Sequence, residues 1–207
     1  MTTTLPRTSQ TLTARSRRTR TALVAAVRSN LRVHGTFTAD SVADRAGCSP
    51  ATFYSHFGAK DDALTAAFDQ TLTELVDGSV QRLTVAAFDD AGIDATVAAF
   101  VEWQAQFFRV ESLVFRAALS RLPAHQPLRA AYRRAEEQTL THMDATLSTL
   151  QTAGTVRTGD TIELAEAFMI ASQGINNPRA LRSGAAGQRA ALAAGISGML
   201  KPRGISQ

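Results

Sequence analysis

The chain has 207 residues, a net charge of +4 and a single cysteine, and 44% of its residues are hydrophobic. This length allows a substantial hydrophobic core, and one cysteine excludes an internal disulfide, so we expect a cytoplasmic protein. Charges interrupt the apolar segments well before about 18 residues, which excludes a membrane-spanning helix. The apolar stripe of the basic first helix is narrow and is needed for packing, so no membrane partner is expected.

Charge is distributed unevenly along the chain. Residues 1–60 contain nine Lys or Arg and two Asp, a net charge of +7. Residues 61–207 contain thirteen basic and sixteen acidic residues, a net charge of −3. A basic end on an acidic body indicates an anionic partner that meets one end of the molecule. A basic, solvent-exposed helix face would have the same composition, so charge alone leaves both interpretations open.

Apolar residues recur at intervals of three and four through most of the chain, a pattern that predicts an all-α protein of about nine helices. Residues 1–12 precede the periodic segments and are expected to form a flexible basic arm. The first helix is predicted over about 13–33, with Gly35 closing it. The second begins after Thr38, which is a suitable N-cap, and ends at Gly47.

The third predicted helix is short and begins with Ser49 as its N-cap. Pro50 then takes the first helical position, where a missing N–H costs nothing. Phe53 and Phe57 fall four residues apart on one face, where we expect them to belong to a core. Two short helices joined by a tight turn at Gly47 have the form of a helix-turn-helix, whose second helix enters the DNA major groove N-terminus first.

Six further helices are predicted in the rest of the chain, separated mainly by segments that contain Pro, Gly or Asn. They cover about 60–83, a segment around 97–107, then 113–122, 127–150 and 161–175, and a last segment around 192–199.

The sequence FTADSVADRAGCSPATFYSHFGAKDDAL, residues 37–64, resembles the DNA-binding signature of the tetracycline-repressor (TetR) family. The resemblance implies an all-helical homodimer. Its three-helix domain, residues 13–59, would bind double-stranded operator DNA of near-palindromic sequence. Its larger domain, residues 60–207, would bind a small effector and dimerise.

Carried over to this chain, the resemblance implies two kinds of DNA contact. Base edges would meet Pro50, Ala51 and Thr52, and phosphates would meet Thr38, Ser49, Tyr54, His56 and Lys60. The chemistry agrees, because a helix N-terminus offers free N–H groups to phosphate, and Tyr, His and Lys side chains donate to it. The third helix begins without Arg, Lys, Asn or Gln, so we expect specificity from DNA shape or from a groove contact by Arg17 and Arg18.

The larger domain contains many aromatic and Met residues, and the resemblance makes an apolar ligand pocket there an expectation. The candidate lining residues are Phe100, Trp103, Phe107, Phe115, Tyr132, His142, Met143, Met169 and Gln173. Further polar candidates are Gln104, Arg116, Glu137 and Asn176. Each aromatic side chain also suits the core of a helical bundle, so the sequence leaves both roles open.

The last two predicted helices are the candidates for a dimer interface, because two helices from each subunit make a four-helix bundle. The final one is rich in Ala and Gly, which allow close helix packing. The candidate interface residues are Leu164, Phe168, Ile175, Leu192, Ile196 and Met199. Phe168 suits the pocket equally well.

These observations predict a ligand-responsive transcriptional regulator, most simply a repressor that a small, largely apolar effector releases from DNA. The alternative is a helical DNA-binding protein whose larger domain only dimerises or binds a protein partner, without an effector. No catalytic motif and no metal-ligand spacing of the four histidines is present, so we expect neither an enzyme nor a cofactor.

Overall fold

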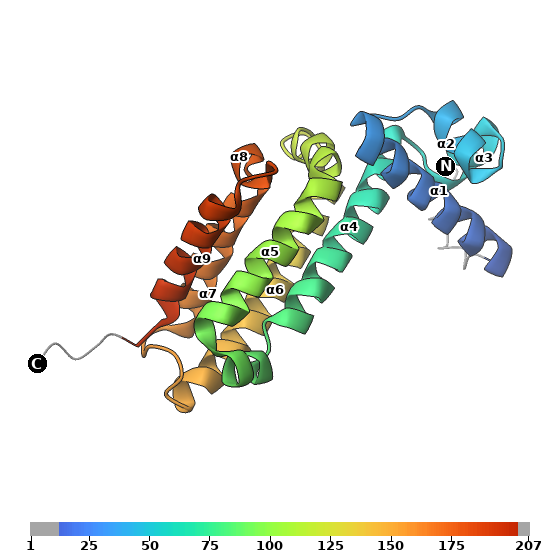
Figure 1. The fold of residues 1–207 in the computed structure, drawn as a ribbon. Helices are drawn as coiled ribbons and strands as arrows, with labels where there is room; N and C mark the ends of the chain where they lie inside the picture. Colours follow the sequence, from blue (N-terminus) through green and yellow to red (C-terminus); the bar gives the residue numbers. More distant parts are fainter. Residues whose placement is uncertain (1–12, 203–207) are drawn as a thin grey trace, which may run out of the picture.

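The computed structural model describes residues 13–202, and Figure 1 shows their arrangement. Nine α helices and one 3-10 turn make up this part of the chain, which contains no strand, so the predicted all-α fold is confirmed for it. The helices are α1 (Ala14–His34), α2 (Ala39–Ala46), α3 (Pro50–His56), α4 (Lys60–Arg82), α5 (Val85–Leu119), α6 (Gln126–Thr152), α7 (Thr161–Gln173), α8 (Pro178–Leu181) and α9 (Ala186–Leu200). The 3-10 turn, η1, spans Gly174–Asn176.

The first three helices begin and end at the predicted signals. Thr38 caps α2 by accepting from the Ser41 amide, while the Ser41 hydroxyl accepts from the Thr38 amide. Ser49 caps α3 by accepting from the Thr52 amide. Gly35 and Gly47 close α1 and α2 with φ angles of 69° and 66°, in the left-handed region that glycine adopts most readily. Local chemistry therefore sets the helix-turn-helix geometry. The predicted arm, residues 1–12, lies outside the described residues.

The remaining helices form an elongated bundle, and α1–α3 lie at one end of it (Figure 1). Within the bundle α4 packs against α5 and α6, α5 packs against α9, and α6 packs against α7. Helix α1 joins the two parts, because it packs against both α4 and α5.

Two elements differ from the sequence prediction. The segment predicted as a separate helix over 113–122 continues α5, because neither Gly nor Pro interrupts the chain before Leu119. Helix α5 breaks instead near its start, where Gly92 has φ 79° and ψ 169°. The Thr96 hydroxyl donates to the Ala87 carbonyl across this break. Helix α8 was not predicted, because its four residues are too few to show a hydrophobic period.

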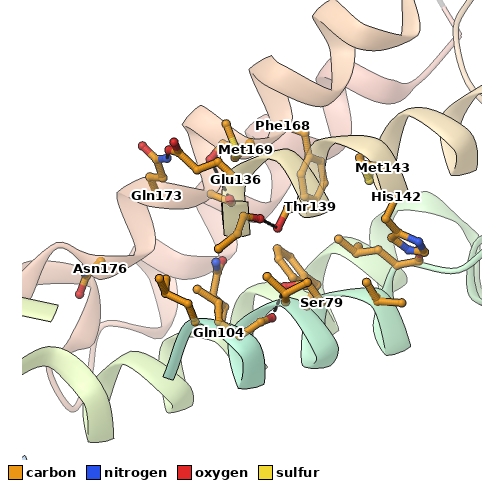
Figure 2. Close-up of a pocket in the computed structure, with 18 of the residues that line it drawn as sticks. Ser79, Gln104, Glu136, Thr139, His142, Met143, Phe168, Met169, Gln173 and Asn176 are labelled. Atoms are coloured by element: carbon orange, nitrogen blue, oxygen red, sulfur yellow. Dashed lines mark hydrogen bonds between the residues drawn. The ribbon is translucent and has the colours of Figure 1, made fainter. Parts of the chain in front are cut away.

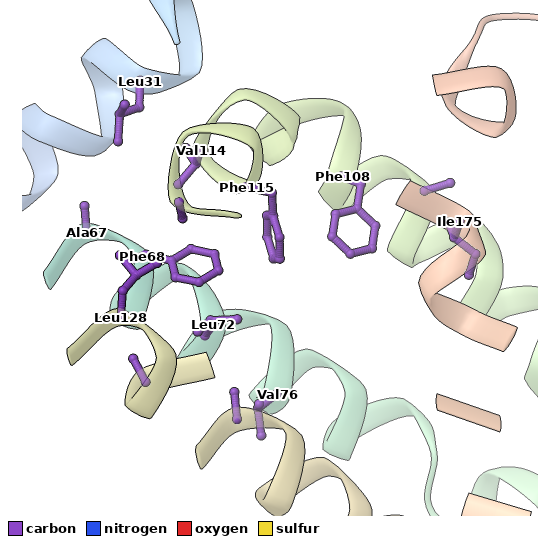
Figure 3. Packing of buried hydrophobic residues seen from close by; sticks show 14 of the residues in the cluster. Leu31, Ala67, Phe68, Leu72, Val76, Phe108, Val114, Phe115, Leu128 and Ile175 are labelled. Carbon is purple, nitrogen blue, oxygen red and sulfur yellow. The ribbon is translucent and has the colours of Figure 1, made fainter. Parts of the chain in front are cut away.

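The buried apolar side chains form one cluster that extends from α1 to α9. Figure 3 shows part of it, with Leu31 of α1 facing Ala67 and Phe68 of α4, and Val114 and Phe115 of α5 close by. The Phe68 and Phe115 rings meet edge to face with centroids 5.1 Å apart. The three-helix end and the bundle therefore share a hydrophobic core.

A group of charged side chains centred on the buried Arg28 and Glu111 also ties α1 to the bundle. Arg28 of α1 donates from Nη2 to Glu111 of α5 at 2.7 Å and forms a two-bond pair with Glu74 of α4. Arg32, one turn later, donates from Nε to the same Glu111 oxygen at 2.8 Å. Burial opposes the charge on Arg28, but the two carboxylates outweigh it and raise its pKa. Both Arg28 and Glu111 are buried, so this contact depends on the pairing.

Candidate DNA-binding surface and ligand cavity

Helix α3 presents a polar surface at the end of the molecule. Phe53 and Phe57 point inward and are buried, as predicted, whereas Tyr54 is 56% exposed. The Ser49 hydroxyl accepts from the Thr52 amide at 3.3 Å and lies 3.0 Å from the Thr52 hydroxyl. The residues predicted to touch DNA lie at the surface, half-buried for Thr52 and His56 and exposed for Thr38, Ser49, Pro50, Ala51, Tyr54 and Lys60.

The orientation of α3 is fixed by contacts from α1. Arg20 donates from Nη1 to the His56 carbonyl at 2.8 Å, and its guanidinium lies 4.5 Å from the centre of the Phe57 ring. Lys60 lies with its Nζ 5.4 Å from the centre of the Phe37 ring. These contacts hold both ends of the α3–α4 junction. Arg20 thus positions α3. Sequence analysis missed this role because the hydrogen-bond partner of Arg20 is a backbone atom 36 residues away.

Arg17 and Arg18 are exposed on the first turns of α1. Their groove contact stays a prediction.

A cavity of about 300 Å³ lies inside the bundle, between α4, α5, α6, α7 and η1. Five aromatic rings, together with Leu, Val and Met side chains, line it. The aromatic residues are Phe100, Phe108, Phe115, Tyr132 and Phe168. Figure 2 shows polar side chains that reach the cavity between them. The polar lining residues are Ser79, Gln104, Glu136, Thr139, His142, Ser172, Gln173 and Asn176. A mostly apolar cavity of this size, with a few polar groups, is typical of small-molecule sites.

Two ionisable groups of the cavity have altered acidity. Burial raises the pKa of Glu136, although hydrogen bonds with Tyr132 and Gln173 oppose the change. Burial also raises the pKa of Tyr132, and the nearby Glu136 carboxylate adds to the effect. His142 makes a 2.9 Å hydrogen bond between its Nε2 and the Leu83 carbonyl.

Seven of the nine predicted lining residues lie in the cavity wall: Phe100, Phe115, Tyr132, His142, Met143, Met169 and Gln173. The other two do not. Trp103 packs on the backbone of α4 at Gly78, with the Arg82 guanidinium 4.4 Å from its ring centre, and Phe107 packs beside it. Neither side chain lines the cavity, because Trp103 lies against α4 and Phe107 packs on Trp103.

The polar candidates divide in the same way. Gln104 and Asn176 reach the cavity, whereas Arg116 lines a different surface hollow. Glu136, and not the predicted Glu137, lines the cavity. Successive side chains are about 100° apart around a helix, so neighbouring residues face different directions. The four-residue spacing from Tyr132 to Glu136 was the signal that could have found it.

The predicted dimer residues face the core of their own subunit. Leu164, Phe168, Ile175 and Ile196 are buried, and Phe168 lines the cavity. Leu192 and Met199 are half-buried. The amphipathic stripe of each helix therefore stabilises the subunit itself, and the outward face carries different residues. On α7 these include Ile162 and Ile170, which are 57% and 66% exposed.

In the described residues, none of the helices combines the length and the apolar character needed to cross a membrane. No protein-family model matches the chain, and no curated protein matches it. Solved structures do match it over most of its length.

A TetR transcription regulator from Haloarcula marismortui has a TM-score of 0.72 and 19% sequence identity, covering 88% of this chain and 98% of its own. NemR from E. coli, in its reduced form, has a TM-score of 0.68 and 14% identity, with 89% and 99% covered. A transcriptional regulator from Rhodococcus sp. Rha1 has a TM-score of 0.65 and 17% identity, with 89% and 98% covered. As the signature in residues 37–64 predicted, the chain has the fold of the TetR-family transcriptional regulators.

Proposed function

We propose that this protein is a ligand-responsive, DNA-binding transcriptional regulator of the cytoplasm. As a homodimer it binds a near-palindromic operator, acts as a repressor, and is released from DNA by a small, largely apolar effector. The observation that carries the proposal is the exposed, capped start of α3 at one end of a molecule whose other part contains an apolar cavity.

The surface of α3 supports DNA binding through its chemistry. Pro50, Ala51 and the Thr52 methyl group suit contacts with thymine methyl groups, and the free amides at the helix start suit a phosphate. Tyr54 and Lys60 then donate to the DNA backbone and fix the register of the helix. The core residues Phe53 and Phe57 are not available for either role.

A dimer would bring two copies of α3 to the same face of DNA, about 34–36 Å apart, the length of one helical turn. The outward faces of α7 and α9 are suited to the pairing. Ile162 and Ile170 are exposed on α7, and the exposed side of α9 consists mainly of small residues that permit close approach. The small residues are Ala190, Ala191, Ala194, Gly195 and Gly198.

Helix α4 supports a coupling between effector and DNA. It begins at Lys60, beside the proposed DNA-binding surface, and one side of it, from Leu72 to Val80, lines the cavity. An effector that prefers a different position of α4 would change the distance between the two copies of α3 in the dimer. It can weaken DNA binding only to the extent that its affinity differs between the two arrangements.

The test begins with DNA fragments selected by the purified protein from a random pool and assayed by gel retardation. The double variant Tyr54→Phe with Lys60→Ala removes two backbone contacts but keeps the ring. We expect its affinity for the selected fragment to fall by on the order of tenfold or more, with a weaker dependence on salt. Lys201→Ala is the matched control, because Lys201 pairs with Asp94 near the C-terminal end of the described chain.

Unchanged retardation by the double variant would refute the role assigned to α3. Equal affinity of the wild-type protein for every duplex would instead indicate a nonspecific DNA-binding protein.

A further inference from the structure

Most polar groups in the cavity wall already have partners within the protein. The Ser79, Thr139 and Ser172 hydroxyls each donate to a backbone carbonyl of their own helix at 2.7–2.9 Å. His142 is bound to the Leu83 carbonyl. These groups therefore need no hydrogen bond from a ligand.

Gln104 is different. The residue is only 6% exposed, and its Oε1 atom is buried without a hydrogen-bond partner among the described residues. A buried acceptor left unpaired costs about 1–3 kcal/mol, so such atoms are usually satisfied by a protein group, water or a ligand. The side chain projects into the cavity (Figure 2), so a ligand that donates a hydrogen bond would satisfy it.

Glu136 supplies the charge of the cavity. Its carboxylate approaches from the side opposite Gln104 (Figure 2), and its hydrogen-bond partners are Gln173, at 3.5 Å, and Tyr132. Among residues 13–202, no Lys or Arg lines the cavity, and the other ionisable lining groups are Tyr132 and His142. An anionic ligand would meet the Glu136 carboxylate without a compensating cation, whereas a cationic ligand would be paired by it.

The aromatic lining also favours a positively charged ligand. The faces of aromatic rings attract cations, most strongly where water is excluded. The Tyr132 ring stacks parallel to that of Phe68 with centroids 6.3 Å apart, and the Phe108 and Phe115 rings meet edge to face at 5.0 Å. This packing holds the rings of the cavity wall in place, so they provide a rigid apolar surround for a positive head group.

We propose that the cavity binds a hydrophobic ammonium ligand, an apolar body of one or two rings that carries a protonated primary or secondary amine. Its N–H groups donate to Oε1 of Gln104 and to the carboxylate of Glu136, and its apolar part lies among the Phe and Met side chains. The inference rests on the proposed function, since it takes this cavity as the effector site. It adds the charge and the hydrogen-bonding character of the effector.

The test compares three probes that share one apolar skeleton: 4-phenylbutylamine, 4-phenylbutanol and 4-phenylbutyrate. Their dissociation constants for the wild-type protein are measured by isothermal titration calorimetry near neutral pH. We expect the amine to bind about tenfold or more tightly than the carboxylate, with the alcohol between them, because only the amine both donates and pairs with Glu136.

Variants separate the two polar contacts. Glu136→Gln is expected to remove the advantage of the amine over the alcohol. Gln104→Leu is expected to weaken the amine and the alcohol but not the carboxylate, because it removes the shared acceptor. Glu137→Gln is the matched control, since it removes the same charge from the next residue of α6, which is exposed and outside this cavity. Thermal unfolding of each variant confirms that it is folded.

Tighter binding of the carboxylate, or no binding of the amine, would overturn the proposal. So would an amine preference that survives in Glu136→Gln or disappears in Glu137→Gln. Operator retardation by the wild-type protein without probe is a separate readout. A failure there would refute the regulatory function, and a failure of the binding series would refute only the ligand class.

Discussion

Gly78 of α4 leaves room for the Trp103 side chain of α5. A Cβ atom at this position would lie 2.1 Å from Cζ2 of Trp103, far inside van der Waals contact. The indole therefore lies directly on the α4 backbone, and Arg82, which donates to the Gly78 carbonyl, covers its outer face. This close approach explains why Trp103 is outside the cavity that the sequence predicted it to line.

We expect Gly78→Ala to destabilise the protein by about 1–3 kcal/mol, although Ala favours helix, because the added methyl group must displace a packed indole. Urea unfolding monitored by tryptophan fluorescence measures the change. Gly187→Ala is the control, since nothing lies within 4 Å of a Cβ placed there. It should be neutral or stabilise the protein by up to about 1 kcal/mol. A variant at Gly78 as stable as the wild type would contradict the packing described here.

At the scale of elements, the joint between α1 and the bundle depends on charge as well as on apolar packing. Arg28 and Glu111 are both buried and paired, and Glu74 completes the pairing from α4. A movement of α4 relative to α1 would therefore take one of its two carboxylate partners from the buried Arg28, although the Glu74 side chain itself is 47% exposed. That cost favours discrete arrangements of the joint over a continuous range of them.

The stability that Glu74 contributes depends on pH in a defined direction. Hydrogen bonding to Arg28 lowers the pKa of Glu74 below its ordinary value of 4.5. A lowered pKa in the folded state means that the stabilisation is complete above the ordinary value and is lost as the pH falls through the folded value. We expect the difference in unfolding free energy between wild type and Glu74→Gln to shrink in acid. Urea unfolding at several values between about pH 7 and pH 3 tests this, and a difference that does not change with pH would contradict it.

Sequence reasoning succeeded where local chemistry determines structure. The caps at Thr38 and Ser49 and the closing glycines at 35 and 47 act within a few residues, so they could be read directly. The charged group at Arg28 could not, because its partners are 46 and 83 residues away and charges have no period. The residues predicted for a dimer interface lie against the core of their own subunit for a related reason. An apolar stripe shows that a face is buried but not what buries it.

At the scale of the whole molecule, the proposed pairing of two subunits would determine whether two copies of α3 can meet one operator. We expect Ile170→Arg to shift the protein from dimer to monomer and to weaken operator binding, because it places a charge where we propose that two subunits meet. Sedimentation velocity at micromolar concentration measures the assembly. Val110→Arg is the control, since Val110 is 53% exposed on α5, outside the proposed interface. An unchanged dimer in the Ile170 variant would refute the α7–α9 interface.

The shared apolar cluster also limits how the molecule can be divided. Leu23, Val27 and Leu31 of α1 belong to the same cluster as residues of α4 and α5. A polypeptide ending at residue 59 would leave part of that apolar surface in water, so we expect α1–α3 not to fold on their own. Heating should melt the molecule in one cooperative step. A compound that binds in the cavity would then also protect the distant helices α1–α3 from proteases.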